Sequence, residues 1–303
     1  METFSLGIAW NWEYDGDFVA GLEHACAERN LTTYRIDPHS LPDALRGLRS
    51  QEIAFSAFLD RASDDDESFE PLMKLLSRSS SRIFNPLQYV EHAKDKATMH
   101  LEFITNGLNV PFTIIISPYN KKKEIELSLS ELSHLGRPFI IKPANTTGGG
   151  TGVVLGAESL KDIIDTRQHH KNDKYLLQET VKPLMFGGHK AWFRVLYAFG
   201  EIIPCWWDDV THIYRPLSVD EENEFGLAGL RHTGETIRKV CNLDFFSSEI
   251  AMDEAKKLVV VDYVNEVCDM RLQSRHVDGV PDNIVRRIQE LIAEETNRSL
   301  TAG

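Results

Sequence analysis

The sequence has few cysteines and no long apolar run. Its four cysteines are widely scattered and form no Cys-x-x-Cys pair, which argues against a zinc knuckle and against a disulfide framework. The longest apolar stretches are far shorter than the roughly 20 residues that cross a bilayer. The first seven residues carry no basic segment of the kind that opens a secretory signal. These absences predict a cytoplasmic protein with reduced thiols and no membrane partner.

Positive charge is also scarce, with 33 Lys and Arg against 46 Asp and Glu and a net charge of −13. Such a balance disfavours nucleic acid as a partner, because the phosphate backbone repels an acidic surface. It leaves room for a local positive pocket that binds ATP or another polyanion. A hydrophobic content of 42% over 303 residues is ordinary for a globular protein and suits two or three lobes.

The first 90 residues alternate short apolar runs with amphipathic stretches. This alternation predicts a parallel, wound β-sheet covered by helices. Three aromatic residues, Trp10, Trp12 and Tyr14, follow the first expected strand directly. Ligands bind at that end of such sheets, although packing at a domain boundary explains these residues equally well. The expected strands are residues 4–9, 31–35, 53–59 and 82–84, and the expected helices are 17–28, 41–48 and 69–77.

The rest of the chain is expected to mix helices with further strands. A single helix is predicted over residues 87–106, another over roughly 220–240, and an amphipathic helix over 281–298. Shorter helices are expected at 130–135 and 159–169. The expected strands are residues 112–116, 138–141, 153–155, 175–181, 191–199, 202–207, 245–251 and 258–264.

A glycine-rich loop lies between two of these strands. Lys142 ends an apolar strand, and the loop Thr146–Gly152 follows with four glycines and three threonines. Glycines allow backbone N–H groups to turn toward a phosphate, and a lysine at the foot of the loop supplies compact positive charge. Loops of this composition are often plain flexible turns, so the loop alone does not predict a binding site.

Other polar residues follow one another in a suggestive order. Each has an ordinary explanation on its own, such as a surface lysine or a salt bridge. Together with the glycine loop they resemble the ATP-grasp superfamily, in particular the branch of glutathione synthetase, D-alanine–D-alanine ligase and the ribosomal S6 modification ligase. The resemblance covers about residues 90–297. The residues that carry it are Lys96, Lys142, the pair Gln178-Glu179, Arg194, Glu249, and Asp262 with Asn265.

The resemblance implies an α/β fold whose ATP-grasp part is α+β, in three lobes. Residues 1–90 would form a wound N-terminal lobe with a parallel sheet. Residues 91–182 would form a small ATP-grasp lobe with a glycine-rich lid, and residues 183–298 a large lobe with a metal site. The two ATP-grasp lobes would clasp a nucleotide between them.

The resemblance also implies roles for individual residues. ATP would be bound with Mg²⁺, for which Mn²⁺ is an alternative. The lysines would contact the α- and β-phosphates, and backbone groups near Glu179 and Val181 would read the adenine edge. Arg194 would face the γ-phosphate and a developing acyl phosphate. The implied nucleotide-binding residues are Lys96, Lys142, Thr146, Thr147, Gly148, Gly149, Gly150, Gln178, Glu179 and Val181; the implied metal ligands are Glu249, Asp262 and Asn265; the implied catalytic residues are Lys142 and Arg194. Arg271 is a further catalytic candidate on its own chemistry, in a segment that departs from the family.

Three features depart from the pattern of that family. Asp262 and Asn265 are three residues apart where the family has a spacing of two, so an extended strand would point them to opposite faces unless a bulge intervenes or the strand ends before Asn265. Residues 266–271 replace the usual small residues and Pro-Gly. Residues 190–192 lack the acidic residue that often precedes the arginine. Arg271 fits either a clamp for a substrate carboxylate or phosphate, or a salt bridge to Asp269 or Glu266.

The implied activity is ATP-dependent ligation of a carboxylate to an amine through an acyl phosphate, with release of ADP and phosphate. The substrates would be an amino acid, a peptide or a small carboxylic acid, together with an amine. Two alternatives stay open: a small-molecule kinase on the same fold, and a nucleotide-binding protein without catalysis. The resemblance is compatible with a homodimer.

Overall fold

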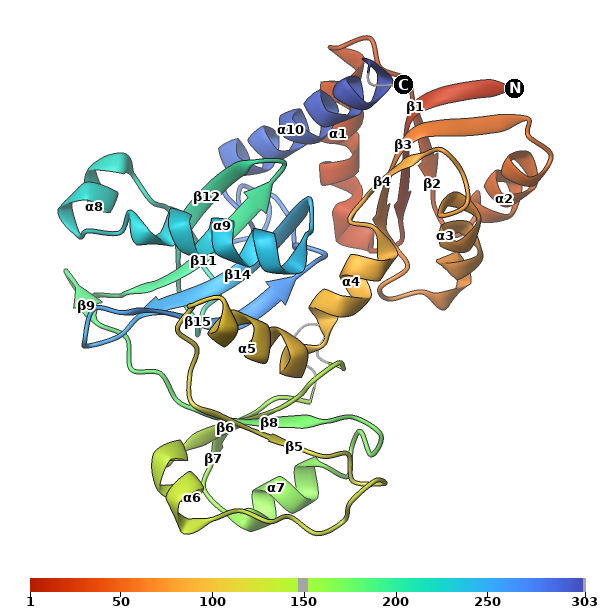
Figure 1. Ribbon diagram of the computed structural model, residues 1–303. Coiled ribbons are helices and arrows are strands. Elements are labelled where there is room, and N and C mark those ends of the chain that lie inside the picture. The colour runs from red at the N-terminus through yellow and green to blue at the C-terminus, as the bar shows by residue number, and fades with distance from the viewer. Residues whose placement is uncertain (147–151, 302–303) are drawn as a thin grey trace.

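The computed structural model describes residues 1–146 and 152–301 (Figure 1). Its N-terminal lobe is built on a sheet of four parallel strands in the order β2-β1-β3-β4, which confirms the wound parallel sheet predicted from the alternating pattern. Parallel neighbours need a crossover between them, and helices supply it. The strands are β1 (Glu2–Trp10), β2 (Thr33–Ile36), β3 (Ile53–Arg61) and β4 (Arg82–Phe84); the helices are α1 (Gly16–Ala27), α2 (Leu41–Arg49) and α3 (Glu70–Leu76), with 3₁₀ turns at Glu13–Asp15 and Glu67–Phe69.

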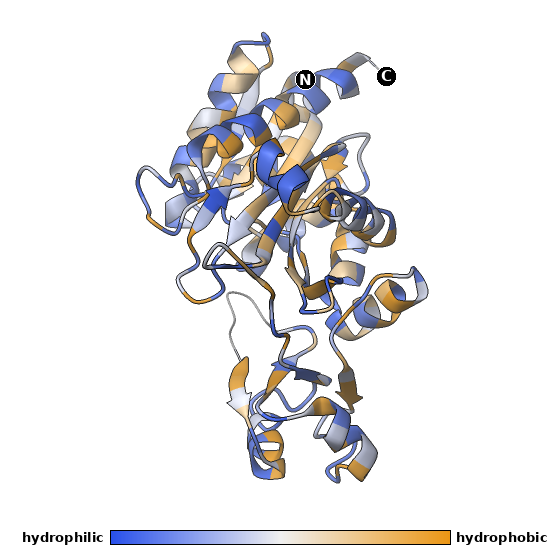
Figure 2. Ribbon diagram, turned by 90° about the vertical axis from the view of Figure 1, so that its left-hand side faces the viewer, coloured by the Kyte–Doolittle hydropathy of each residue, from blue (hydrophilic) through white to orange (hydrophobic). Residues whose placement is uncertain are grey.

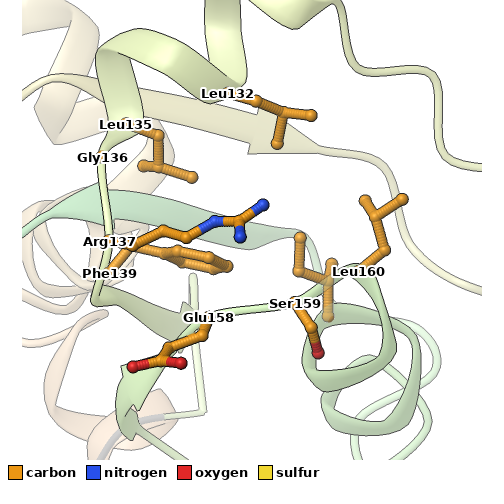
Figure 3. Close-up of a pocket in the computed structure, with 9 residues that line it drawn as sticks. Leu132, Leu135, Gly136, Arg137, Phe139, Glu158, Ser159 and Leu160 are labelled. Atoms are coloured by element: carbon orange, nitrogen blue, oxygen red, sulfur yellow. The ribbon is translucent and has the colours of Figure 1, made fainter.

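The small lobe lies at the bottom of Figure 1 and is an antiparallel sheet in the order β5-β8-β6-β7. Two helices cover one face of the sheet. Between them lies a cavity of about 90 Å³, lined by leucines of α6 and by Phe139 and Ile163 (Figure 3). The elements are β5 (Thr113–Ile116), α6 (Leu129–Leu135), β6 (Phe139–Pro143), β7 (Val154–Ala157), α7 (Leu160–Thr166) and β8 (Tyr175–Glu179).

The large lobe is a five-stranded antiparallel sheet in the order β13-β12-β11-β14-β15. Helices α4, α5 and α9 cover one of its faces, and the C-terminal helix α10 covers the other. The elements are α4 (Leu87–Lys94), α5 (Lys96–Thr105), β9 (Met185–Phe186), β10 (His189–Lys190), β11 (Trp192–Ala198), β12 (Glu201–Trp207), β13 (Tyr214–Pro216), α8 (Val219–Glu224), α9 (Gly229–Cys241), β14 (Phe245–Met252), β15 (Leu258–Asn265) and α10 (Asp282–Thr301).

Two predicted single helices are wrong, because each is a pair of helices. The helix expected over residues 87–106 is broken at Asp95, whose backbone is extended. The Asp95 carboxylate accepts hydrogen bonds from the N–H groups of Ala97 and Thr98 and so caps a new helix. The helix expected over 220–240 divides into α8 and α9, with Gly226 between them at a φ of +67°.

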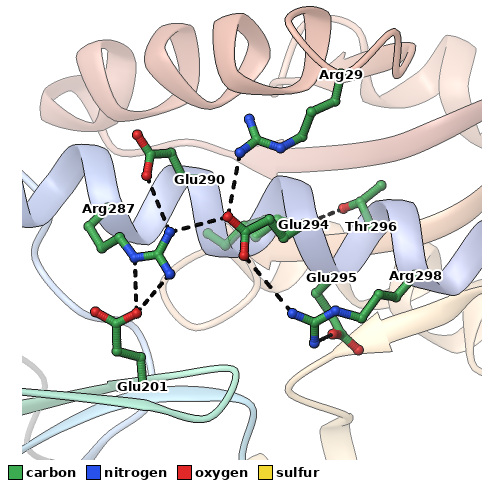
Figure 4. A network of polar contacts seen from close by, with 9 residues as sticks. Arg29, Glu201, Arg287, Glu290, Glu294, Glu295, Thr296 and Arg298 are labelled. Carbon is green, nitrogen blue, oxygen red and sulfur yellow. Dashed lines mark hydrogen bonds and ion pairs between the residues drawn. The ribbon is translucent and has the colours of Figure 1, made fainter.

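Helix α10 joins the N-terminal lobe to the large lobe. Its apolar side shares one hydrophobic core with α1, with β1 and β3, and with the facing side of the large sheet. On its surface, Arg287 forms ion pairs with Glu201 of β12 and with Glu290 and Glu294 of its own helix, and Glu294 also reaches Arg29 (Figure 4). The N-terminal and large lobes therefore form one packed unit. The small lobe is joined to them by a narrower part of the molecule (Figure 2).

Among the described residues, no helix is long and apolar enough to cross a membrane. All four cysteines are buried as free thiols.

Candidate active site

One face of the small-lobe sheet looks toward the large lobe. Along β8, Tyr175 and Leu177 pack into the small lobe's own core, whereas Leu176 packs into the core of the large lobe. Because side chains alternate along a strand, Gln178 shares the face of Leu176. Lys142 of β6 lies directly opposite Leu176 and belongs to the same face. The sheet therefore presents Lys142 and Gln178 to the space between the lobes.

Lys142 reaches across that space to strand β15. It is only 6% exposed, and its Nζ donates to the carbonyl oxygen of Val261 at 3.1 Å. The Nζ also lies 3.7 Å from Oδ1 of Asp262 and 5.2 Å from the centre of the Tyr263 ring. Burial lowers the pKa of Lys142, and the carboxylate of Asp262 opposes that shift. The lysine thus places a poorly hydrated charge beside the carboxylate.

The break between α4 and α5 brings Lys96 close to the end of β6, which carries Lys142. Asp95 caps α5, so Lys96 is the first residue of that helix, and its N–H donates to the carbonyl oxygen of Ala144 at 3.0 Å. Ala144 follows directly after β6. The charge of Lys96 lowers the pKa of both Lys142 and Asp262, which shows that the three groups lie near one another.

The predicted metal ligands share one face of the large sheet. Glu249 of β14 lies opposite Asp262 of β15, and Ser247 lies opposite Asn265. Between these two pairs, Ser248 of β14 faces both Tyr263 and Val264 of β15, which is a β-bulge. Of the two arrangements expected from the sequence, a bulge or a strand that ends before Asn265, the structure has the bulge. Tyr263 and Val264 both turn into the core on the other side of the sheet. The bulge consequently leaves Asp262 and Asn265 on the same side.

Arg194 of β11 lies on this face as well, directly opposite Glu249. Its guanidinium forms an ion pair with Glu249, donates to Oγ of Ser247 at 3.3 Å and stacks over the Trp207 ring at 4.5 Å. Burial is the largest single influence and disfavours this charge, but Glu249 together with Tyr214, Asp262 and Cys268 outweighs burial and raises the pKa of Arg194. The arginine is therefore permanently charged and held in place from three directions.

The charges around Asp262 keep its carboxylate ionised. Burial works to raise its pKa, but Lys96, Lys142 and Arg194 outweigh burial and lower the pKa below its usual value. The site thus combines three cations with two carboxylates that lie opposite each other on adjacent strands.

The donor set fits Mg²⁺ held jointly with phosphate. No group of three or more His, Cys, Asp or Glu side chains in residues 1–146 and 152–301 is arranged to hold a metal ion. Glu249, Asp262 and Asn265 offer two carboxylates and one amide oxygen. Mg²⁺ prefers oxygen ligands and usually keeps part of its shell for substrate phosphates and water. These three residues therefore suit a metal that arrives with a nucleotide, not a closed protein cage.

The glycine loop is anchored at its first residues. The carboxylate of Asp173 accepts hydrogen bonds from the N–H and Nδ2 of Asn145 at 2.9 and 2.8 Å, and from the N–H and Oγ1 of Thr146 at 3.2 and 2.9 Å. Asp173 therefore fixes the start of the loop. The predicted nucleotide-binding residues Thr147, Gly148, Gly149 and Gly150 lie outside the described residues.

The predicted nucleotide-binding residues Gln178, Glu179 and Val181 occupy different environments. Gln178 is fully buried, and its Nε2 donates to Thr113 and Tyr263. The Glu179 N–H donates to the carbonyl oxygen of Phe112, so it is already used within the sheet. Val181 packs against the core that joins the N-terminal and large lobes.

Arg271 lies against the N-terminal aromatic cluster. Its guanidinium pairs with Asp269 at 2.7 Å and Asp278 at 2.8 Å, and it stacks over Trp12 at 5.5 Å. Trp12 and Tyr14 are in edge contact at 5.3 Å. The hydrogen bond to Asp269 is the main cause that raises the pKa of Arg271. The salt bridge to Asp269 expected as one alternative exists, and Glu266 pairs instead with Lys94 at 3.5 Å.

Sequence reasoning missed Asp173, Ser247 and Tyr263. Ser247 had a local signal, because it precedes Glu249 by two residues on a predicted strand. Trp207 follows Trp206 on β12, and because side chains alternate along a strand the two pack into different cores. No neighbouring residue in the sequence indicated that Asp173 or Tyr263 would lie at the site.

Comparison with known proteins identifies the fold. No protein-family model and no curated protein matches this sequence. Among solved structures, a RimK domain protein ATP-grasp from Sphaerobacter thermophilus DSM 20745 aligns with a TM-score of 0.65 at 18% identity, over 95% of this chain and 98% of that one. D-alanine–D-alanine ligase from Bacillus anthracis, complexed with ATP, aligns with a TM-score of 0.65 at 12% identity over 100% and 99%. The ATP-grasp ligase PsnB, complexed with a minimal precursor, Mg and ADP, aligns with a TM-score of 0.62 at 14% identity over 97% and 98%.

These likenesses cover nearly the whole length of every chain compared. The chain has the ATP-grasp fold, as its sequence predicted.

Proposed function

We propose that this protein is an ATP-dependent ligase that joins a carboxylate to an amine through an acyl phosphate and releases ADP and phosphate. One observation carries the proposal. Lys142, from the small lobe, and Arg194, from the large lobe, converge with Glu249 and Asp262. In this arrangement the cationic side chains can bind a polyphosphate, and the carboxylates beside them can bind a metal ion.

The residues of the site would act mainly through charge and position. When bound, Mg²⁺ would neutralise phosphate charge and orient the transferred group. Glu249, Asp262 and Asn265 would hold it, and Lys96 and Lys142 would balance the inner phosphates. Arg194, rigid between Glu249 and Trp207, would stabilise charge that develops on the transferred phosphoryl group. Phosphoryl transfer needs little further chemistry from the protein.

The proposed substrates are a small carboxylic acid, an amino acid or a peptide, together with an amine. Solved structures of this fold include a D-alanine–D-alanine ligase and enzymes in complex with precursor peptides, such as the macrocyclase MdnC bound with the precursor peptide MdnA. The sequence alternative of a nucleotide-binding protein without catalysis depended on Asp262 and Asn265 pointing apart. The bulge places them on one side, which favours a metal-dependent reaction.

Phosphorus NMR of the protein with Mg-ATP and an array of amino acids and dipeptides tests the proposal. A ligase gives ADP and orthophosphate only when the correct acid is present. A stable phosphorylated product would instead show a kinase, and AMP with pyrophosphate would refute attack at the γ-phosphate.

Two variants and their controls connect the reaction to the site. Lys142→Ala and Glu249→Gln should remove turnover. Lys161→Ala and Glu224→Gln, which change the same residue types on exposed faces of α7 and α8, should leave it intact.

A further inference from the structure

The small-lobe sheet gathers positive charge at the end where the glycine loop begins. Ile116 of β5, Pro143 of β6 and Tyr175 of β8 lie side by side at that end. Two loops meet there, residues 117–123 after β5 and residues 167–174 before β8. Together they contain six lysines and arginines and one aspartate, although the whole chain has a net charge of −13. We call these two loops the basic surface, because a local excess of this kind attracts a negatively charged partner.

The side chain of Arg167 holds the basic surface in one shape. Arg167 is only 1% exposed, and its guanidinium reaches across to the first loop. It donates there to three backbone carbonyl oxygens, those of Ser117, Lys122 and Lys123, at 2.5, 2.8 and 3.3 Å. The backbone N–H of Asn120 adds a hydrogen bond to the carbonyl oxygen of Lys171 at 3.0 Å. The backbones that carry the lysines of both loops are therefore fixed before a partner binds.

Much of the charge on this surface lacks a counter-charge. Lys121, Lys123 and Lys171 are exposed and form no ion pair with any described residue. Two other lysines are paired, Lys122 with Glu126 at 3.1 Å and Lys174 with Asp95 at 2.5 Å. The carboxylate of the single aspartate, Asp173, is occupied by the start of the glycine loop. Three ammonium groups are consequently left to bind anions from outside the chain.

The basic surface adjoins the proposed nucleotide site without being part of it. Asp173 of the second loop binds Asn145 and Thr146, where the glycine loop begins. On the other side of that loop, a Cβ atom on Gly152 would lie 3.3 Å from Nε2 of His170. Both ends of the glycine loop therefore touch residues 167–174. A molecule bound to the basic surface would lie next to the loop that is expected to cover the phosphates.

We propose that the basic surface docks an acidic peptide segment, which is the carboxylate-rich part of the substrate of this enzyme. Three ammonium groups on a fixed backbone can bind several carboxylates of one extended chain, and their field raises the local concentration of such a chain. The inference rests on the proposed ligase function and narrows its substrate to a peptide with several acidic side chains.

An acidic peptide fits this surface better than a nucleic acid does. Proteins that bind single strands present aromatic rings on which bases stack. The tyrosine of these loops, Tyr119, instead has Arg167 and Lys171 over its ring, each at 6.0 Å from the ring centre. A long polyanion would also extend beyond the two loops onto an acidic protein, which repels it.

Fluorescence anisotropy with a fluorescein-labelled hexaglutamate tests the inference, with hexaserine as the uncharged probe. We expect the wild type to bind hexaglutamate and not hexaserine, and the affinity to fall as sodium chloride is added. A triple variant removes the unpaired charges: Lys121→Gln, Lys123→Gln and Lys171→Gln. It should bind hexaglutamate about tenfold more weakly, as expected for the loss of three exposed ion pairs.

A matched triple variant controls for net charge. It changes three exposed lysines of the large lobe: Lys239→Gln, Lys256→Gln and Lys257→Gln. Its affinity for hexaglutamate should stay within about twofold of the wild type, because exposed charges more than a Debye length away are screened. Carbodiimide coupling, which joins a peptide carboxylate to a nearby lysine amine while the carbodiimide takes up the released water, should place the crosslinks on Lys121, Lys123 or Lys171.

The inference is overturned if the wild type does not bind hexaglutamate, or if the two triple variants lose affinity equally. Displacement of the peptide by Mg-ATP would place it on the phosphate-binding lysines instead, and tighter binding of hexathymidylate would assign the surface to nucleic acid. Peptide binding needs no turnover. A protein that binds hexaglutamate but never releases ADP refutes the proposed ligase, whereas one that releases ADP but does not bind hexaglutamate refutes the docking surface alone.

Discussion

The Nζ atom of Lys142, on the small lobe, lies 3.7 Å from Oδ1 of Asp262, on the large lobe. The two residues are 120 positions apart in the sequence, yet they meet where the small lobe faces the large lobe at the proposed site. Burial of the ammonium works against its charge, as its lowered pKa shows. Function and stability are therefore expected to make opposite demands on Lys142.

Lys142→Met should separate those two demands. Methionine removes a poorly hydrated charge but also removes the donor to the Val261 carbonyl, and the two effects nearly cancel. We expect the free energy of unfolding in urea to change by less than about 2 kcal/mol. ADP production should fall by at least about 100-fold, because an electrostatic contact to the phosphates is lost. A variant that unfolds readily would show that Lys142 is mainly structural.

Asp173→Asn should loosen the start of the glycine loop. Asparagine keeps the size of the side chain but replaces an acceptor oxygen by an N–H₂ group, which faces donors of Asn145 or Thr146. We expect a loss of about 1–3 kcal/mol in the free energy of unfolding. Hydrogen exchange at the Asn145 and Thr146 amides should also accelerate. Asp165→Asn, an exposed change on α7, is the control, and equal exchange in both variants would contradict the anchor.

The buried ion pair of Arg61 and Asp15 should show strong coupling. Both Asp15 oxygens accept from the guanidinium at 2.7 Å, and Nη2 also donates to the Cys268 carbonyl at 2.9 Å, which ties the N-terminal lobe to the segment after β15. Asp15→Asn leaves a buried arginine without its counter-charge, so we expect a loss of about 3–5 kcal/mol. The double change Arg61→Met with Asp15→Leu should cost less than the sum of the single changes.

A double-mutant cycle by urea unfolding measures this coupling. The exposed pair Arg46 and Asp43 is the comparison, and its removal should have no measurable effect. Additive losses at Arg61 and Asp15 would argue against a coupled pair.

His100 should make stability depend on pH. Its pKa is about 4 in the folded protein and about 6.5 when unfolded, so between these values the unfolded chain binds the additional proton. Stability from the neutral ring is complete above pH 6.5 and is lost as the pH falls toward 4. The maximum loss is about 3 kcal/mol, since one pKa unit corresponds to about 1.4 kcal/mol.

Urea unfolding of the wild type and His100→Gln at several pH values measures that contribution. Other carboxylates titrate in the same range in both proteins, so the difference between the two curves isolates His100. Parallel curves would mean that the ring is not held neutral by its surroundings, which include Lys142 and the Tyr263 hydroxyl.

Local patterns in the sequence determined the classes of structure. The alternation of short apolar runs and amphipathic stretches in the first 90 residues predicted the parallel sheet. Such a prediction is possible because the hydrophobic periodicity of a strand or a helix is visible within a short stretch of sequence. Because side chains alternate along a strand, the spacing of Asp262 and Asn265 required either a bulge or a strand that ends before Asn265 if both were to share a face. The order of Lys96, Lys142, Arg194 and Glu249 indicated the fold, which structural comparison confirms.

Only the tertiary structure decided which groups meet. Asp173 binds Asn145 across 28 positions, and Tyr263 binds His100 across 163, so neither contact leaves a trace in neighbouring residues. The break at Asp95 also escaped prediction, because the helical pattern continues through it while the capping carboxylate starts a new helix. Composition does not show which side chains are buried. Burial removes water from a side chain, and its charge or hydrogen bond then depends on a single protein partner.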